Sequence, residues 1–91
     1  MKIKKAGLIV NEERDKSLQI TKKLVKFLQE QGVDVFLPEN LISQFPESKL
    51  IHTLSEPYHE LNIFFSLGGD GTLLSATRLA SPHAIPVCGI N

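Results

Sequence analysis

The chain has few of the features that mark specialised protein classes. Its 91 residues include no tryptophan and a single cysteine, Cys88, so no disulfide can form within it. This excludes a disulfide-stapled secreted scaffold and is typical of a reducing compartment, so we expect a cytoplasmic protein. Because Cys88 lies in an apolar run, we expect its small side chain to be buried in a strand.

Neither sign of charge is in excess, and no apolar run is long. Ten basic residues balance ten acidic ones, which gives a formal net charge of +0. Domains that bind nucleic acid through its phosphates carry basic surfaces, so we expect no nucleic-acid partner. No apolar run approaches the ~20 residues that span a bilayer, and the lysine-rich start lacks the apolar stretch of a signal peptide. We therefore expect no membrane partner.

The residues that most often bind metals are few and irregularly spaced. His52, His59 and Glu60 match no usual ligand pattern, so we expect them to be surface residues and expect no metal site built by the protein.

Apolar runs alternate with amphipathic stretches along the chain. We expect strands over residues 3–10, 33–37, 61–67 and 85–90, helices over 15–31 and 72–80, and one or two short helices within 39–61. Nearly continuous apolar strands separated by helices are typical of parallel sheets that are covered on both faces. The pattern therefore predicts a Rossmann-like, three-layer α/β/α domain whose sheet has four parallel strands.

The helical periodicity also predicts which side chains face the core. For the first helix the expected buried stripe is Leu18, Ile20, Thr21, Leu24, Val25, Phe27 and Leu28, with Gly32 in the left-handed conformation that ends the helix. For the second long helix the expected packing face is Leu73, Leu74, Ala76 and Ala80.

The most informative segment is Gly68-Gly69-Asp70-Gly71-Thr72, between an expected strand and an expected helix. Glycines allow a sharp turn and a close approach of the backbone to a ligand, and the start of a helix attracts negative charge. A bare backbone beside one carboxylate therefore suits a phosphate group and a nearby hydroxyl. The simpler alternative is a structural turn in which Asp70 is the helix N-cap.

The expected topology brings further polar residues to this segment. In an open parallel sheet, ligands bind beyond the carboxyl ends of the strands. Asn11 ends the first expected strand, residues 68–71 follow the third, and Asn91 ends the fourth. We expect all of them along one edge of the sheet.

The segment Leu67-Gly68-Gly69-Asp70-Gly71-Thr72-Leu73-Leu74 resembles the signature of the NAD kinases. The residues from Ile85 to Asn91 resemble that family's second motif, which breaks off after Asn91. The resemblance covers residues 5–91. It implies that residues 1–91 form the N-terminal α/β nucleotide-binding domain of such an enzyme, without the family's all-β C-terminal domain.

The resemblance implies phosphorylation of the 2′-hydroxyl of the adenosine ribose of NAD to give NADP. The phosphoryl donor is ATP or polyphosphate, with Mg²⁺ or another divalent metal, and the full-length protein is a homo-oligomer. Asp70 matches the catalytic proton acceptor, and Ser75 stands where relatives often have a basic residue. The expected nucleotide-binding residues are Gly68, Gly69, Gly71, Thr72, Leu74, Asn11 and Asn91. The chain alone, holding half of an active site, is expected to be inactive.

Two alternatives stay open. The first is a lipid kinase of the diacylglycerol or sphingosine type, because those enzymes share Gly-Gly-Asp-Gly; their motif usually continues into a Gly- and Asn-containing turn rather than Leu73-Leu74-Ser75. The second is a non-enzymatic, receiver-like regulatory module, for which the acids after the first strand, Glu12 and Glu13, are suitable but the glycines are not.

Overall fold

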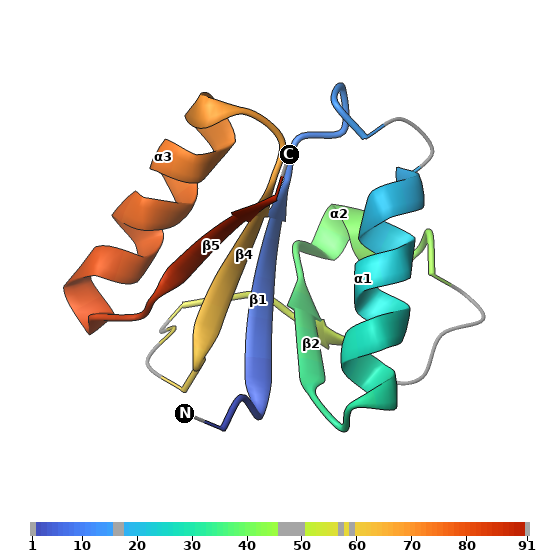
Figure 1. Cartoon of the computed structure of the whole chain (residues 1–91), viewed down its shortest axis with the longest axis horizontal. Helices are drawn as coiled ribbons and strands as arrows, with labels where there is room; N and C mark the ends of the chain where they lie inside the picture. Colours follow the sequence, from blue (N-terminus) through green and yellow to red (C-terminus); the bar gives the residue numbers. More distant parts are fainter. Residues whose placement is uncertain (1, 16–17, 46–50, 57, 59, 91) are drawn as a thin grey trace.

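A computed structural model describes residues 2–15, 18–45, 51–56, 58 and 60–90 of the chain. These residues form a five-stranded, all-parallel sheet with the strand order β3-β2-β1-β4-β5 (Figure 1). The strands are β1 (Lys5–Val10), β2 (Asp34–Leu37), β3 (His52–Thr53), β4 (Ile63–Leu67) and β5 (Val87–Ile90). The helices are α1 (Gln19–Glu30), α2 (Glu39–Ile42) and α3 (Asp70–Ala80), followed by a 3₁₀ turn at Ser81–His83.

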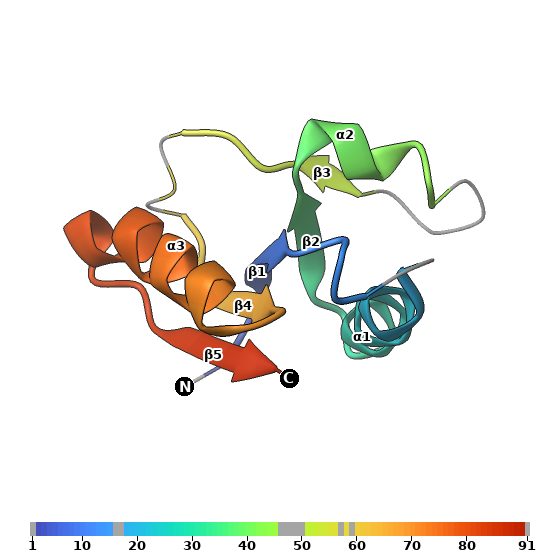
Figure 2. The same cartoon turned by 90° about the horizontal axis from the view of Figure 1, so that it is seen from above.

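The elements form three layers, as the sequence predicts. Figure 2 shows α1 and α3 on opposite faces of the sheet. The larger apolar cluster joins α1 and α2 to one face, through residues such as Leu8, Val25 and Leu37. The smaller cluster joins the end of α3 to the other face, through Phe64, Ala80 and Ile85. The Rossmann-like fold class is thereby confirmed.

The expectation of four strands is wrong, because β3 adds a fifth. Its two residues pair in parallel with β2, Phe36 opposite His52 and Leu37 opposite Thr53. The rings of Phe36 and His52 stack with their centroids 4.7 Å apart. Such a short strand has no alternation to read. The sequence predicts one or two short helices in this connector, and one is present among the described residues as α2.

The helix α1 begins at Gln19, four residues later than expected, and a carboxylate outside the helix binds its first turn. Asp15 is buried, and its Oδ1 accepts a hydrogen bond from the Ile20 amide at 3.0 Å. Its Oδ2 accepts hydrogen bonds from the Thr21 amide at 2.8 Å and the Thr21 hydroxyl at 2.6 Å. At the other end, Gly32 has a φ of +78°, which confirms its predicted left-handed conformation.

Five apolar side chains that were expected to be buried are instead exposed. They are Ile20 (46%), Phe27 (56%), Leu73 (38%), Leu74 (52%) and Cys88. Each long helix covers only part of the sheet: α1 contacts β2, and α3 contacts β4, β5 and β1. Cys88 lies on the edge strand β5 and, by register with Phe65, on the face where α1 packs, so no described helix covers it.

Among the described residues, no helix combines the length and apolar character that crossing a membrane requires.

Replacing Asp15 by Asn is expected to lower the free energy of unfolding at pH 7 by about 1–3 kcal/mol, because three hydrogen bonds to a buried carboxylate are weakened. Denaturant titration measures the change. The matched control is Asp34→Asn, at an exposed carboxylate, which is expected to change stability little. Equal losses in the two variants would contradict the capping role of Asp15.

The same variant should change the pH dependence of stability. Burial raises the pKa of Asp15, but hydrogen bonds from Thr21 and from the amides of Ile20 and Gln19 outweigh it, so the pKa lies below its ordinary value of 3.8. The stabilisation is therefore complete above pH 3.8 and is lost as the pH falls from there through the lower pKa of the folded state. The free energy of unfolding, measured by denaturant titration at several pH values, should therefore change less with pH across this acid range in Asp15→Asn than in the parent.

Candidate functional site

The glycine-rich loop joins the end of β4 to the start of α3. Gly69 is the N-cap residue of α3, Asp70 is the first helical residue, and no side chain caps the helix. The interpretation of Asp70 as an N-cap is therefore wrong, because the helix begins one residue earlier than that role requires. The side chain of Asp70 is exposed and is not engaged in capping the helix.

Gly68 is the point where three elements meet. It has a φ of +151°, and a Cβ there would lie 2.7 Å from the Thr72 hydroxyl and 2.8 Å from the Cβ of Asn11. The Asn11 amide donates a 2.8 Å hydrogen bond to the Leu67 carbonyl, and the Gly68 amide donates one of 3.2 Å to the Ile90 carbonyl. The ends of β1, β4 and β5 are thus joined at the loop, as the topology predicts; Asn91 lies outside the described residues.

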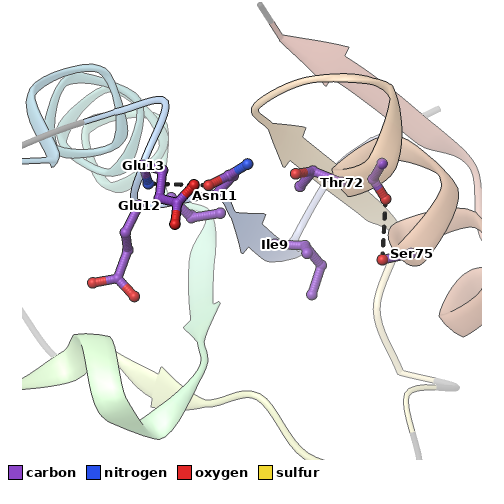
Figure 3. A pocket seen from close by; sticks show the side chains of 8 residues that line it. Ile9, Asn11, Glu12, Glu13, Thr72 and Ser75 are labelled. Carbon is purple, nitrogen blue, oxygen red and sulfur yellow. Dashed lines mark hydrogen bonds between the residues drawn. The ribbon is translucent and has the colours of Figure 1, made fainter.

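Asn11 organises the connection between β1 and α1. Its carbonyl accepts hydrogen bonds from the amides of Arg14 (3.0 Å) and Asp15 (3.2 Å), and its Oδ1 accepts one from the Glu13 amide (3.0 Å). Its side-chain nitrogen points toward Thr72 (Figure 3). Asn11 therefore has a structural role in addition to the binding role that the sequence predicts. The nitrogen of its side chain, Nδ2, remains available to a ligand.

A cavity of about 480 Å³ opens beside the loop on the α3 side. Figure 3 shows Asn11, Glu12 and Glu13 on one side of it and Thr72 and Ser75 on the other, with Ile9 between them. Ser75 donates a 3.1 Å hydrogen bond to the Gly71 carbonyl.

Of the predicted binding residues, Asn11, Gly71 and Thr72 line this cavity. Gly71 is exposed, and nothing lies within 4 Å of the place that a Cβ would take there. Leu74 is exposed but is not among the residues that line the cavity.

A second, smaller cavity of about 180 Å³ lies on the α1 side of the loop, bordered by Gly68 and by Arg14 and Asp15. Sequence reasoning missed these last two residues. The available signal was position: both follow Asn11 within the connection that the topology places at the carboxyl edge.

The described residues contain no group of three or more His, Cys, Asp or Glu side chains that could hold a metal ion. His52 stacks on Phe36 instead, and Glu60 forms an exposed ion pair with Lys5 at 3.5 Å. His59 lies outside the described residues.

Comparison with known proteins identifies the family. A family model described as "ATP-NAD kinase N-terminal domain" matches residues 6–91. The chain belongs to the NAD kinase family. It is 34% identical to a protein named NAD kinase from Caldanaerobacter subterraneus subsp. tengcongensis, over 98% of this chain and 31% of the relative. Proteins of the same name from Heliobacterium modesticaldum and Chlorobium luteolum are 32% and 39% identical, over 93% and 96% of this chain.

The chain spans about 30% of the length of these curated relatives, 31%, 30% and 30% in the three cases. Membership in the NAD kinase family argues against the two alternative interpretations of the Gly-Gly-Asp-Gly segment, the lipid kinase and the regulatory module.

The two end glycines of the loop should respond differently to alanine. Gly68→Ala is expected to lower the free energy of unfolding by about 1–3 kcal/mol, because the new methyl group meets Asn11 and Thr72 at a left-handed φ. Gly71→Ala, the matched control in open space, is expected to leave stability unchanged or slightly higher. Denaturant titration measures the free energy of unfolding of both variants. A larger loss of stability in Gly71→Ala than in Gly68→Ala would contradict the described loop.

Proposed function

We propose that residues 1–91 are the N-terminal nucleotide-binding domain of an NAD kinase, which transfers a phosphoryl group from ATP or polyphosphate to the 2′-hydroxyl of the adenosine ribose of NAD. The observation that carries the proposal is the exposed carboxylate of Asp70 on the first turn of α3, between the bare backbones of Gly69 and Gly71. Membership in the family supports the same reaction.

In this reaction Asp70 acts as the general base. Its carboxylate accepts the proton of the 2′-hydroxyl while the ribose oxygen attacks the terminal phosphorus of the donor, and ADP or a shortened polyphosphate leaves. Because Asp70 is exposed and caps no helix, its oxygens are available to a substrate. The uncapped start of α3 favours the negative charge of the phosphates nearby.

The nucleotide-binding role predicted for Asn11 and Thr72 fits their places around the loop. A divalent cation is expected to reach this site with the donor rather than from a cage of protein ligands, because the described residues form no cluster of three ligands. Mg²⁺ is usually held by one or two carboxylates together with substrate phosphates. The cation would neutralise part of the negative charge of the phosphates.

Asp70→Asn in the full-length protein is expected to lower the turnover of NAD to NADP by about 10²–10⁴-fold, because it removes the proton acceptor while keeping the shape of the side chain. Stability should change little, since Asp70 is exposed. The matched control is Asp34→Asn at the exposed start of β2. A fall of less than about threefold would show that Asp70 is not the base.

The 91-residue chain alone is expected to form no NADP from NAD, Mg²⁺ and ATP or polyphosphate. It spans only about 30% of the length of its curated relatives, 31% and 30% in two cases. Orientation of both substrates and exclusion of water contribute much of a phosphoryl-transfer rate, and an open cavity supplies little of either. Turnover near that of a complete NAD kinase would refute the interpretation as half of an active site.

A further inference from the structure

The guanidinium group of Arg14 lies against the backbone of Gly69. The place that a Cβ of residue 69 would take is 3.4 Å from Cζ and Nη2 of Arg14 and 3.8 Å from Nε. Gly69 itself has a φ of −101° and a ψ of −163°, an extended conformation that any residue adopts. Glycine is therefore not needed at position 69 to permit a turn. Its lack of a side chain leaves the backbone of the loop open on the side where the Arg14 guanidinium lies.

Among the residues that the structure describes, no hydrogen bond or ion pair accounts for the position of the Arg14 side chain. It is exposed, and within the part of the chain that the structure describes no carboxylate forms an ion pair with it. Its guanidinium N–H groups are therefore free to donate to a ligand.

Arg14 forms no ion pair with the neighbouring acids that the structure describes. Asp15 borders the same small cavity and is ionised at neutral pH, but both of its oxygens accept hydrogen bonds from the first turn of α1. Glu12 and Glu13 line the larger cavity on the α3 side. The small cavity on the α1 side is thus bordered by a guanidinium whose donors have no described partner and by a carboxylate whose oxygens are already engaged, whereas two exposed carboxylates, Glu12 and Glu13, line the larger cavity.

We propose that Arg14 binds a phosphate group of the nucleotide that lies along Gly68 and Gly69, and reaches it from the α1 side of the loop. This inference rests on the proposed function, since it takes the loop as a nucleotide site. The planar guanidinium provides two parallel N–H donors that match two phosphate oxygens. The phosphate belongs either to the donor or to the diphosphate bridge of NAD, which share this chemistry.

Steady-state kinetics of the full-length protein tests the inference and separates the two sources. Arg14→Gln is compared with Arg14→Lys and with Arg78→Gln, an exposed arginine in the last turn of α3 that serves as the matched control. One series varies ATP or polyphosphate at saturating NAD, and the other varies NAD at saturating donor. We expect Arg14→Gln to raise one KM by about tenfold to a hundredfold, Arg14→Lys to raise it less, and Arg78→Gln to leave both unchanged.

A raised KM for the donor assigns Arg14 to the donor phosphates, and a raised KM for NAD assigns it to the diphosphate bridge. If both KM values of Arg14→Gln equal those of Arg78→Gln, the inference is overturned. Calorimetric titration with inorganic tripolyphosphate and pyrophosphate provides a readout that needs no catalysis. We expect Arg14→Gln to weaken the binding of one of these anions, and binding equal to that of the Arg78 control would overturn the inference.

The two measurements also separate this inference from the proposed function. A protein that binds tripolyphosphate through Arg14 but forms no NADP refutes the proposed kinase activity and leaves the phosphate contact standing. A protein that forms NADP with unchanged KM values for Arg14→Gln refutes the phosphate contact alone. Circular dichroism of each variant checks the fold, which the exposed Arg14 side chain is not expected to affect.

Discussion

The close meeting of Asn11, Gly68 and Thr72 is the constraint on which the site depends. No side chain fits at position 68, because the end of β1 and the first turn of α3 both contact that residue. Hydrogen bonds from Asn11 to Leu67 and from Gly68 to Ile90 extend this junction across three strands. The start of α3, which carries Asp70, is thereby held at the carboxyl edge of the sheet by the backbone itself.

The two long helices cover opposite faces of the sheet at opposite edges. The helix α1 contacts β2 at one side of one face, whereas α3 contacts β4 and β5 at the other side of the opposite face (Figure 2). Ile20 and Phe27 on α1 and Cys88 on β5 are therefore exposed. Single exposed apolar side chains are common on protein surfaces, so these positions mark only where the cover of the helices ends.

The sequence predicts the fold class well because its strands and long helices have strong patterns. The four longer strands, the helix stop at Gly32 and the meeting of Asn11 with the glycine loop all follow from periodicity and topology. Periodicity fails where a tertiary contact decides. It finds neither the two-residue β3 nor the later start of α1, which depends on Asp15 contacting residues five and six positions further on. It also predicts burial for Ile20 and Phe27, because an apolar stripe shows which face is apolar but not how much of that face a neighbour covers.

The site shows the same division between local and spatial information. The Gly-Gly-Asp-Gly segment is visible in the sequence because glycines have a recognisable backbone chemistry. Yet its glycines do different things: Gly68 avoids a collision, Gly71 faces open space, and Gly69 has an ordinary extended backbone beside the guanidinium of Arg14. Only the folded chain makes this distinction, because Arg14 lies far from Gly69 in sequence. Gly69 neither turns the chain nor avoids a collision, and Arg14, which has no ion-pair partner among the described residues, borders the same space; the phosphate contact that we propose would account for both features.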